Sequence, residues 1–183
     1  MKVYIKNQQR LIRINHQRIE GLLKKALRLL GLLNAELSIL FVNDRRMRIM
    51  NRYYRNVDRP TDVLSFPQED NPLLRPFGKN TPTPPFGKDT PLPPFSKGGR
   101  GGIIAKGKGG ETARLQDVVL GDIVINLHKA RRQAIEHCLT LNEELKRLLI
   151  HGLLHLTGYG HEKGGYDEEK MRRKERQLLA RIS

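Results

Sequence analysis

The chain has 183 residues, a length that fits one domain with a single buried core. Its 34 basic and 19 acidic residues give a formal net charge of +15, which attracts polyanions such as nucleic acid, although a generally basic proteome produces the same imbalance. It contains no apolar run of about eighteen residues, so we expect no membrane span. The single cysteine, Cys138, cannot form an internal disulfide, which predicts a cytoplasmic protein without a disulfide partner.

The first forty residues predict a strand, a helix and a second strand. Val3–Ile5 is typical of a short strand. Apolar residues then recur at helical spacing over Ile19–Leu30, and Gly31 is expected to end that helix. Ala35–Val42 alternates between apolar and polar residues well enough for a strand with one buried face.

A second helix with a basic outer face is predicted next. Asn43 or Asp44 can cap it, and its outward positions hold Arg45, Arg46, Arg48 and Arg52. Pro60 stops the helical run, and Asp62–Phe66 is expected to form a short strand. Arg55 lies at the junction, where its guanidinium could project into a cleft or simply face solvent.

The composition changes between Gln68 and Asp117. Pro76–Pro84 and Pro85–Pro93 are two copies of a nine-residue repeat, and a third copy degenerates into glycines. A segment so rich in proline and glycine has little apolar surface to bury, so we predict a disordered insertion within one domain spanning residues 1–183. The alternatives are a proline-rich ligand for a partner domain and a basic arm that contacts RNA.

The remainder predicts a strand followed by helices. Val118–Asn126 is rich in β-branched residues and predicts a buried strand. The predicted helices cover residues 127–138, 141–156 and 167–182. Thr140 and Glu143 have the spacing of a capping box before the second of them. Asp122 lies inside the apolar strand, so its carboxylate is either hydrogen-bonded at a sheet edge or turned toward an active site.

Three of the six histidines fall close together near the C-terminal end of the chain. His151 and His155 are four residues apart, so both rings lie on one helix face and can reach one metal ion. Gly158 can turn the chain in a left-handed cap, which would let His161 supply a third nitrogen. Three imidazoles without a fourth protein ligand predict a catalytic zinc site. The alternative is three unrelated histidines, the interpretation that suits His16, His128 and His137.

Three segments together resemble the YbeY family of bacterial endoribonucleases, the rRNA maturation factors. They are Arg55–Pro67 with its PTDVLSFP sequence, Leu120–Ile123, and the H-G-x-L-H-L-x-G-Y-x-H pattern of His151–His161. The resemblance implies an α/β (α+β) fold in which helices pack on a small mixed sheet. It also implies one zinc ion per chain and single-strand-specific RNA cleavage in rRNA maturation, including the 3′ end of small-subunit rRNA, and in ribosome quality control. The implied partners are rRNA and ribosomal or pre-ribosomal particles.

Carried over by position, the resemblance makes His151, His155 and His161 the zinc ligands and gives Arg55 a catalytic role. Ser65 and Asp122 become candidates to line the substrate or to support the ligands. Two positions depart from the family pattern. Gly160 replaces a usual acidic residue, so a hydrogen bond that orients His161 is absent or comes from elsewhere. Asn56 replaces a usual glycine.

The residue after the first histidine bears on the chemistry. Zinc proteases of the H-E-x-x-H type have a glutamate base there, whereas this chain has Gly152. Phosphodiester cleavage can instead use the 2′-hydroxyl of RNA or a metal hydroxide, with Arg55 neutralising charge on the phosphate. Two rivals remain: a zinc protease whose base is Asp122 or Glu162, and a ribosome assembly factor with a structural zinc.

Overall fold

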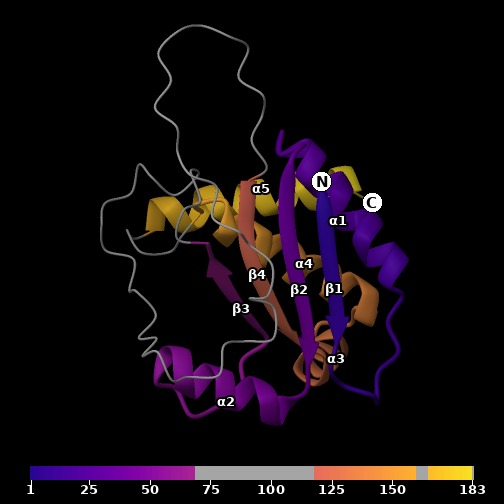
Figure 1. Cartoon of the computed structure of the whole chain (residues 1–183), viewed down its shortest axis with the longest axis vertical. Helices are drawn as coiled ribbons and strands as arrows, with labels where there is room; N and C mark the ends of the chain where they lie inside the picture. Colours follow the sequence, from indigo (N-terminus) through magenta and orange to yellow (C-terminus); the bar gives the residue numbers. More distant parts are fainter. Residues whose placement is uncertain (69–117, 160–164, 183) are drawn as a thin grey trace, which may run out of the picture.

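A mixed sheet with the strand order β1-β2-β4-β3 is the centre of the fold. The computed structural model in Figure 1 describes residues 1–68, 118–159 and 165–182. Within them the strands are β1 Lys2–Asn7, β2 Ala35–Val42, β3 Val63–Pro67 and β4 Val118–Asn126. β1, β2 and β4 are parallel, and β3 pairs antiparallel with β4 at one edge. The expected α/β fold around a small mixed sheet is therefore confirmed.

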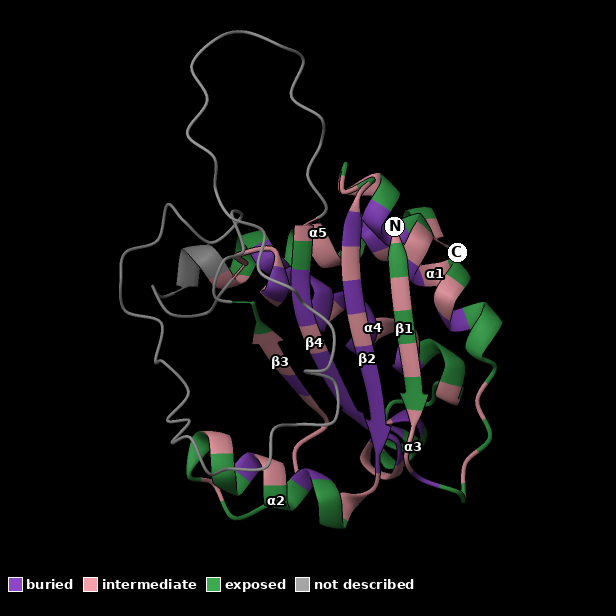
Figure 2. Cartoon of the chain, viewed as in Figure 1, coloured by how far each residue is buried: buried purple, intermediate pink, exposed green. Residues whose placement is uncertain are grey.

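The helices cover the two faces of the sheet unequally. They are α1 His16–Leu29, α2 Asp44–Arg55, α3 Leu127–Glu136, α4 Leu141–Leu156 and α5 Gly165–Ile182. Because side chains alternate along a strand, Leu37 and Ile39 of β2 join the main core with α1, α3, α4 and α5. Leu40 and Val42 join a smaller core with Met47 of α2 on the opposite face. Figure 2 shows the buried central strands between these layers.

Local capping explains where several helices begin. Asn15, Asn43 and Asn126 each accept a hydrogen bond from a backbone N–H of the first helical turn. The cap at Asn15 starts α1 at His16, three residues before the first apolar residue of the predicted pattern. Thr140 and Glu143 form the expected capping box.

Residues with a positive φ angle follow the ends of α2 and α4. Gly158 has a φ of 89° just after α4, as predicted from its lack of a Cβ atom. Asn56 ends α2 in the left-handed conformation with a φ of 55°. Asparagine tolerates this conformation better than most other residues with a side chain.

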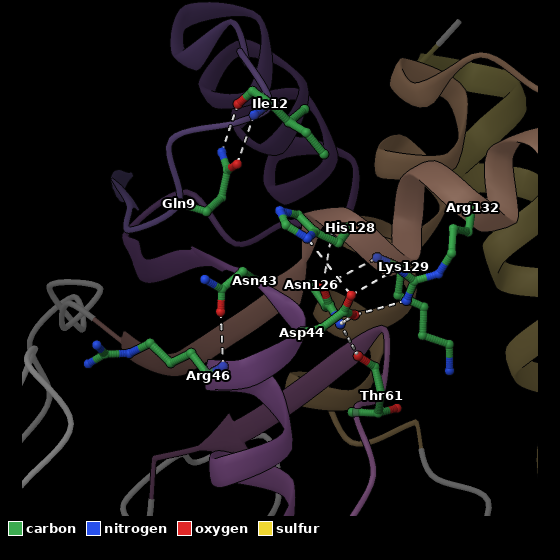
Figure 3. A network of polar contacts seen from close by, with 10 residues as sticks. All are labelled: Gln9, Ile12, Asn43, Asp44, Arg46, Thr61, Asn126, His128, Lys129 and Arg132. Atoms are coloured by element: carbon green, nitrogen blue, oxygen red, sulfur yellow. Dashed lines mark hydrogen bonds and ion pairs between the residues drawn. The ribbon is translucent and has the colours of Figure 1, made fainter.

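A polar network fastens the start of α2 to α3 (Figure 3). Asn126 is fully buried and donates to Asp44 Oδ1 at 2.8 Å and to the Thr61 carbonyl at 3.1 Å. Arg132 donates two hydrogen bonds of 2.9 Å to the carboxylate of Asp44. The hydrogen bond from Arg132 is the main reason that the pKa of Asp44 falls from 3.8 to about 2.

The predicted insertion, residues 68–117, lies almost wholly outside the described residues. The strands on either side of it are neighbours, because Pro67 of β3 pairs with Gly121 of β4. Gly121 has a φ of 129°, and a Cβ atom there would lie 2.1 Å from the carbonyl oxygen of Phe66. None of the helices in the described part of the chain has the length and hydropathy that a membrane span requires.

Candidate metal centre

Two histidines of α4 turn their ring nitrogens toward each other. The Nε2 atoms of His151 and His155 are 3.2 Å apart, and the ring centroids are 4.8 Å apart. Both side chains are half-buried. The i, i+4 spacing on one helix therefore produces the convergent pair of nitrogens that the sequence predicted.

Glu175 of α5 lies beside the other ring nitrogen of His151. Its Oε2 atom is 3.6 Å from Nδ1, and the Glu175 side chain is only 14% exposed. A carboxylate in this place favours the His151 tautomer with hydrogen on Nδ1, which leaves the lone pair of Nε2 for a metal ion. Sequence reasoning missed Glu175. The available signal was its spacing, since it follows Met171 by four residues and precedes Leu178 by three, and both of these are buried.

The helix that carries the histidines lies very close to the sheet. A Cβ atom on Gly152 would lie 3.0 Å from Ile123 Cγ2 and 3.2 Å from Ser65 Oγ. The Ser65 hydroxyl also donates to the Gly152 carbonyl at 3.4 Å. Gly152 therefore lets α4 approach β3 and β4, and it brings Ser65 to the helix that holds the candidate ligands.

In the turns before His151, a buried carboxylate forms an ion pair within the same helix. Glu144 is fully buried, and Arg147 donates to its two oxygens at 3.0 and 2.5 Å. The hydrogen bond to Glu144 raises the pKa of Arg147, and Glu175 adds a smaller attraction. Arg147 is thus a fixed positive charge near the carboxylate that faces His151. Its role was not predicted.

Asp122 lies on the other side of the sheet from the histidines, and Arg55 is the last residue of α2. Asp122 pairs in register with Phe66, whose ring contacts Tyr54 of α2 with centroids 4.6 Å apart, so Asp122 lies on the sheet face opposite α4. Burial raises the pKa of Asp122, and a hydrogen bond with Ser38 partly offsets that effect. Arg55 is exposed at the C-terminal end of α2. Of the two alternatives for Asp122, the structure shows a hydrogen-bonded carboxylate, on an interior strand rather than at an edge.

The third predicted ligand, His161, lies outside the described residues, as do Gly160 and Glu162. Within residues 1–68, 118–159 and 165–182, no three histidine, cysteine or acidic side chains form a group that could hold a metal ion. The described part of the chain therefore contributes the His151 and His155 pair, with Glu175 behind it.

Comparison with known proteins identifies the family. The chain matches the family described as Endoribonuclease YbeY over residues 4–183. It is 35% identical over 182 residues to the Endoribonuclease YbeY of Aquifex aeolicus, an alignment that covers 100% of this chain and 92% of that relative. The chain belongs to the YbeY endoribonuclease family. The relationship expected from the three sequence segments is confirmed.

A second relative supports membership of the YbeY family, and a solved structure has a similar fold. The Endoribonuclease YbeY of Pelotomaculum thermopropionicum is 38% identical over 151 residues, which cover 81% of this chain and 73% of that relative. The solution structure of TM1509 from Thermotoga maritima has a similar fold, with a TM-score of 0.55 and 20% sequence identity. That match covers 98% of this chain and 88% of that structure, and it bears on the fold alone.

The residues of this YbeY family member fit a metal ion. Two nitrogens bound tetrahedrally to one zinc ion, each at about 2.0–2.1 Å, lie about 3.3 Å apart. The Nε2 atoms of His151 and His155 are separated by 3.2 Å. The carboxylate of Glu175 at Nδ1 supplies the orienting partner that metal-bound histidines usually have.

Proposed function

We propose that this chain is a zinc-dependent endoribonuclease that cleaves single-stranded RNA in rRNA maturation, including the 3′ end of small-subunit rRNA, and in ribosome quality control. Membership of the YbeY family supports RNA as the substrate. The observation that carries the metal site is the 3.2 Å separation of the His151 and His155 Nε2 atoms. In this proposal His161 is the third ligand, the protein acts in the cytoplasm, and pre-ribosomal particles are its partners.

The chain's own groups have distinct tasks in the proposed reaction. A bound zinc ion would supply Lewis acidity for the phosphate and lower the pKa of water. His151 and His155 would hold the ion through Nε2, and Glu175 would keep the proton of His151 on Nδ1. Arg55 neutralises charge that builds on the scissile phosphate, a role that requires RNA to reach the end of α2. Ser65 holds its strand against α4 through the Gly152 carbonyl.

Two observations argue against the zinc protease alternative. Asp122, one of its two candidate bases, lies on the sheet face opposite α4, and Gly152 occupies the usual place of the glutamate base. Proteases of the H-E-x-x-H type carry their glutamate base at this position. In this chain a mere Cβ atom would already lie 3.0 Å from Ile123 Cγ2 and 3.2 Å from Ser65 Oγ. The helix face that would hold the base is therefore packed against the sheet, and cleavage of RNA does not need such a base.

The test combines metal analysis with RNA cleavage for the wild-type protein and His155→Ala. We expect about one zinc ion per wild-type chain and cleavage of a single-stranded rRNA fragment. His155→Ala should remain folded by circular dichroism and lose both the metal and about 10³-fold or more of the cleavage rate. The matched control is His16→Ala, because His16 is exposed at the start of α1.

Two outcomes would contradict the proposal. Full RNA cleavage by metal-free His155→Ala would show that the histidine site does not perform the reaction. Unfolding of His155→Ala, together with a wild-type protein that binds ribosomes but does not cut RNA, would favour an assembly factor with structural zinc.

A further inference from the structure

α2 presents an exposed basic face on the side of the sheet opposite the histidines. Five of its twelve residues are arginines, against one aspartate. All five arginine side chains are exposed, and Met47 on the other face of the helix packs against the sheet. We call Arg45, Arg48, Arg52 and Tyr53 the α2 arginine face. Figure 2 shows this helix at the lower end of the sheet with much of its surface exposed.

The face is hollowed and includes apolar and aromatic surface. A depression of about 660 Å³ is lined by the four residues of the α2 arginine face and by Ile49, Asn56 and Asp58. The Ile49 side chain is 60% exposed and that of Tyr53 is 41% exposed. Guanidinium groups beside an exposed aromatic ring are the combination that binds single-stranded nucleic acid, because phosphates pair with the former and bases stack on the latter.

The carboxylates near this face are already engaged. Asp58 accepts hydrogen bonds from Arg48 Nε at 2.8 Å and Nη2 at 2.6 Å. Asp44 accepts two hydrogen bonds from the guanidinium of Arg132 in α3. Because these pairs neutralise the acidic residues, the positive charge of Arg45 and Arg52 dominates the face. The two arginines are seven residues apart, which places their Cα atoms about 10 Å apart along the helix axis.

We propose that the α2 arginine face is a second RNA-binding surface, in which Arg45 and Arg52 contact phosphates and Tyr53 stacks on a base of the same single strand. The inference rests on the proposed function for the identity of its ligand. α2 and α4 cover opposite faces of the sheet, and β3 is the edge strand between them. An RNA strand that occupies both sites therefore passes around the β3 edge.

Binding is tested separately from cleavage. The affinity of the full-length protein for a labelled single-stranded RNA of about twenty nucleotides is measured by fluorescence anisotropy across a salt series, and the RNA is checked for intactness afterwards. The variant Arg45→Gln/Arg52→Gln removes two charges from the face. The matched control, Arg18→Gln/Arg28→Gln, removes two exposed charges from α1, which packs on the other face of the sheet.

We expect Arg45→Gln/Arg52→Gln to raise the Kd about tenfold and to flatten the slope of log K against log salt by about 1.4, the value for two lost phosphate contacts. The Arg18→Gln/Arg28→Gln control should bind within about twofold of the wild type, with an unchanged slope. Tyr53→Ala should raise the Kd about fivefold or more, and Tyr53→Phe, which keeps the ring, should restore binding. Thermal unfolding checks that each variant is folded.

Several results would overturn the proposal. If both double variants lost RNA affinity equally, the result would show only a diffuse effect of net charge. If Tyr53→Ala bound the RNA as tightly as the wild type, Tyr53 would not stack on a base. If Arg45→Gln/Arg52→Gln bound the RNA as tightly as the wild type, the α2 arginine face would not bind RNA, and another ligand such as an acidic protein would become the candidate. Because no cleavage is measured, these results do not depend on whether the histidine site is catalytic.

Discussion

Glu175 illustrates how one side chain on a neighbouring helix can set the chemistry of a candidate ligand. Its carboxylate lies 3.6 Å from His151 Nδ1 and is mostly shielded from solvent. Glu175→Gln removes the charge that favours hydrogen on Nδ1, so we predict zinc affinity about 10–100-fold lower. Competition with a chromogenic chelator measures the affinity, and the absorption spectrum of the cobalt-substituted protein reports a changed ligand field.

Glu168→Gln is the matched control for Glu175→Gln. Glu168 is also on α5 but pairs with Arg172 at the surface, away from His151. Glu168→Gln should bind zinc as the wild type does, and both variants in their metal-free form should unfold near the wild-type temperature. Unchanged zinc affinity and an unchanged cobalt spectrum in Glu175→Gln would show that Glu175 does not position His151.

At the scale of elements, Asp44 connects the first turn of α2 to α3. Its pKa is lowered from 3.8 to about 2 in the folded protein, mainly by the hydrogen bond from Arg132. A lowered carboxyl pKa stabilises the fold fully above pH 3.8, and this contribution is lost as the pH falls through about 2. Asp44→Asn should therefore lower Tm at pH 7 by about 2–4 °C, the shift for about 1 kcal/mol in a partly exposed, screened pair.

The difference in Tm between the wild type and Asp44→Asn should shrink steadily below pH 4 and become small near pH 2 in a series of thermal melts. Asp58→Asn is the comparison, since Asp58 pairs with Arg48 on the exposed surface, and we expect little change in Tm at any pH. A difference for Asp44→Asn that stayed constant down to pH 2 would mean that the Asp44 charge does not stabilise the fold.

Local sequence patterns predicted most of the helices and strands, whereas the contacts between them could not be predicted from the sequence. The capping box of Thr140 and Glu143 lies within one turn, so its spacing alone identified the start of α4. The face on which Asp122 lies depends on its register with Phe66, across a long stretch of intervening chain. The approach of Glu175 to His151 depends on how α5 packs on α4, which no local pattern specifies.

For the molecule as a whole, the sheet brings the two sides of the predicted insertion together. Pro67 pairs with Gly121, and the Gln68 N–H donates to the Leu120 carbonyl at 3.1 Å. Replacing residues 69–117 with about four Gly and Ser residues should therefore leave the sheet intact. Loop-closure entropy grows with loop length, so we predict a gain of up to about 2 kcal/mol in the free energy of unfolding.

Denaturant unfolding and RNA binding of the shortened protein together test whether residues 1–183 form one domain. A cooperative transition at a higher midpoint, with RNA affinity retained, is the expected result, because the described cores and both candidate RNA contacts come from other residues. A lower midpoint would show that residues 69–117 contribute contacts to the folded domain. A higher midpoint with strongly reduced RNA affinity would instead make the insertion an RNA-binding arm, and its basic residues would then account for part of the attraction that the α2 arginine face otherwise supplies.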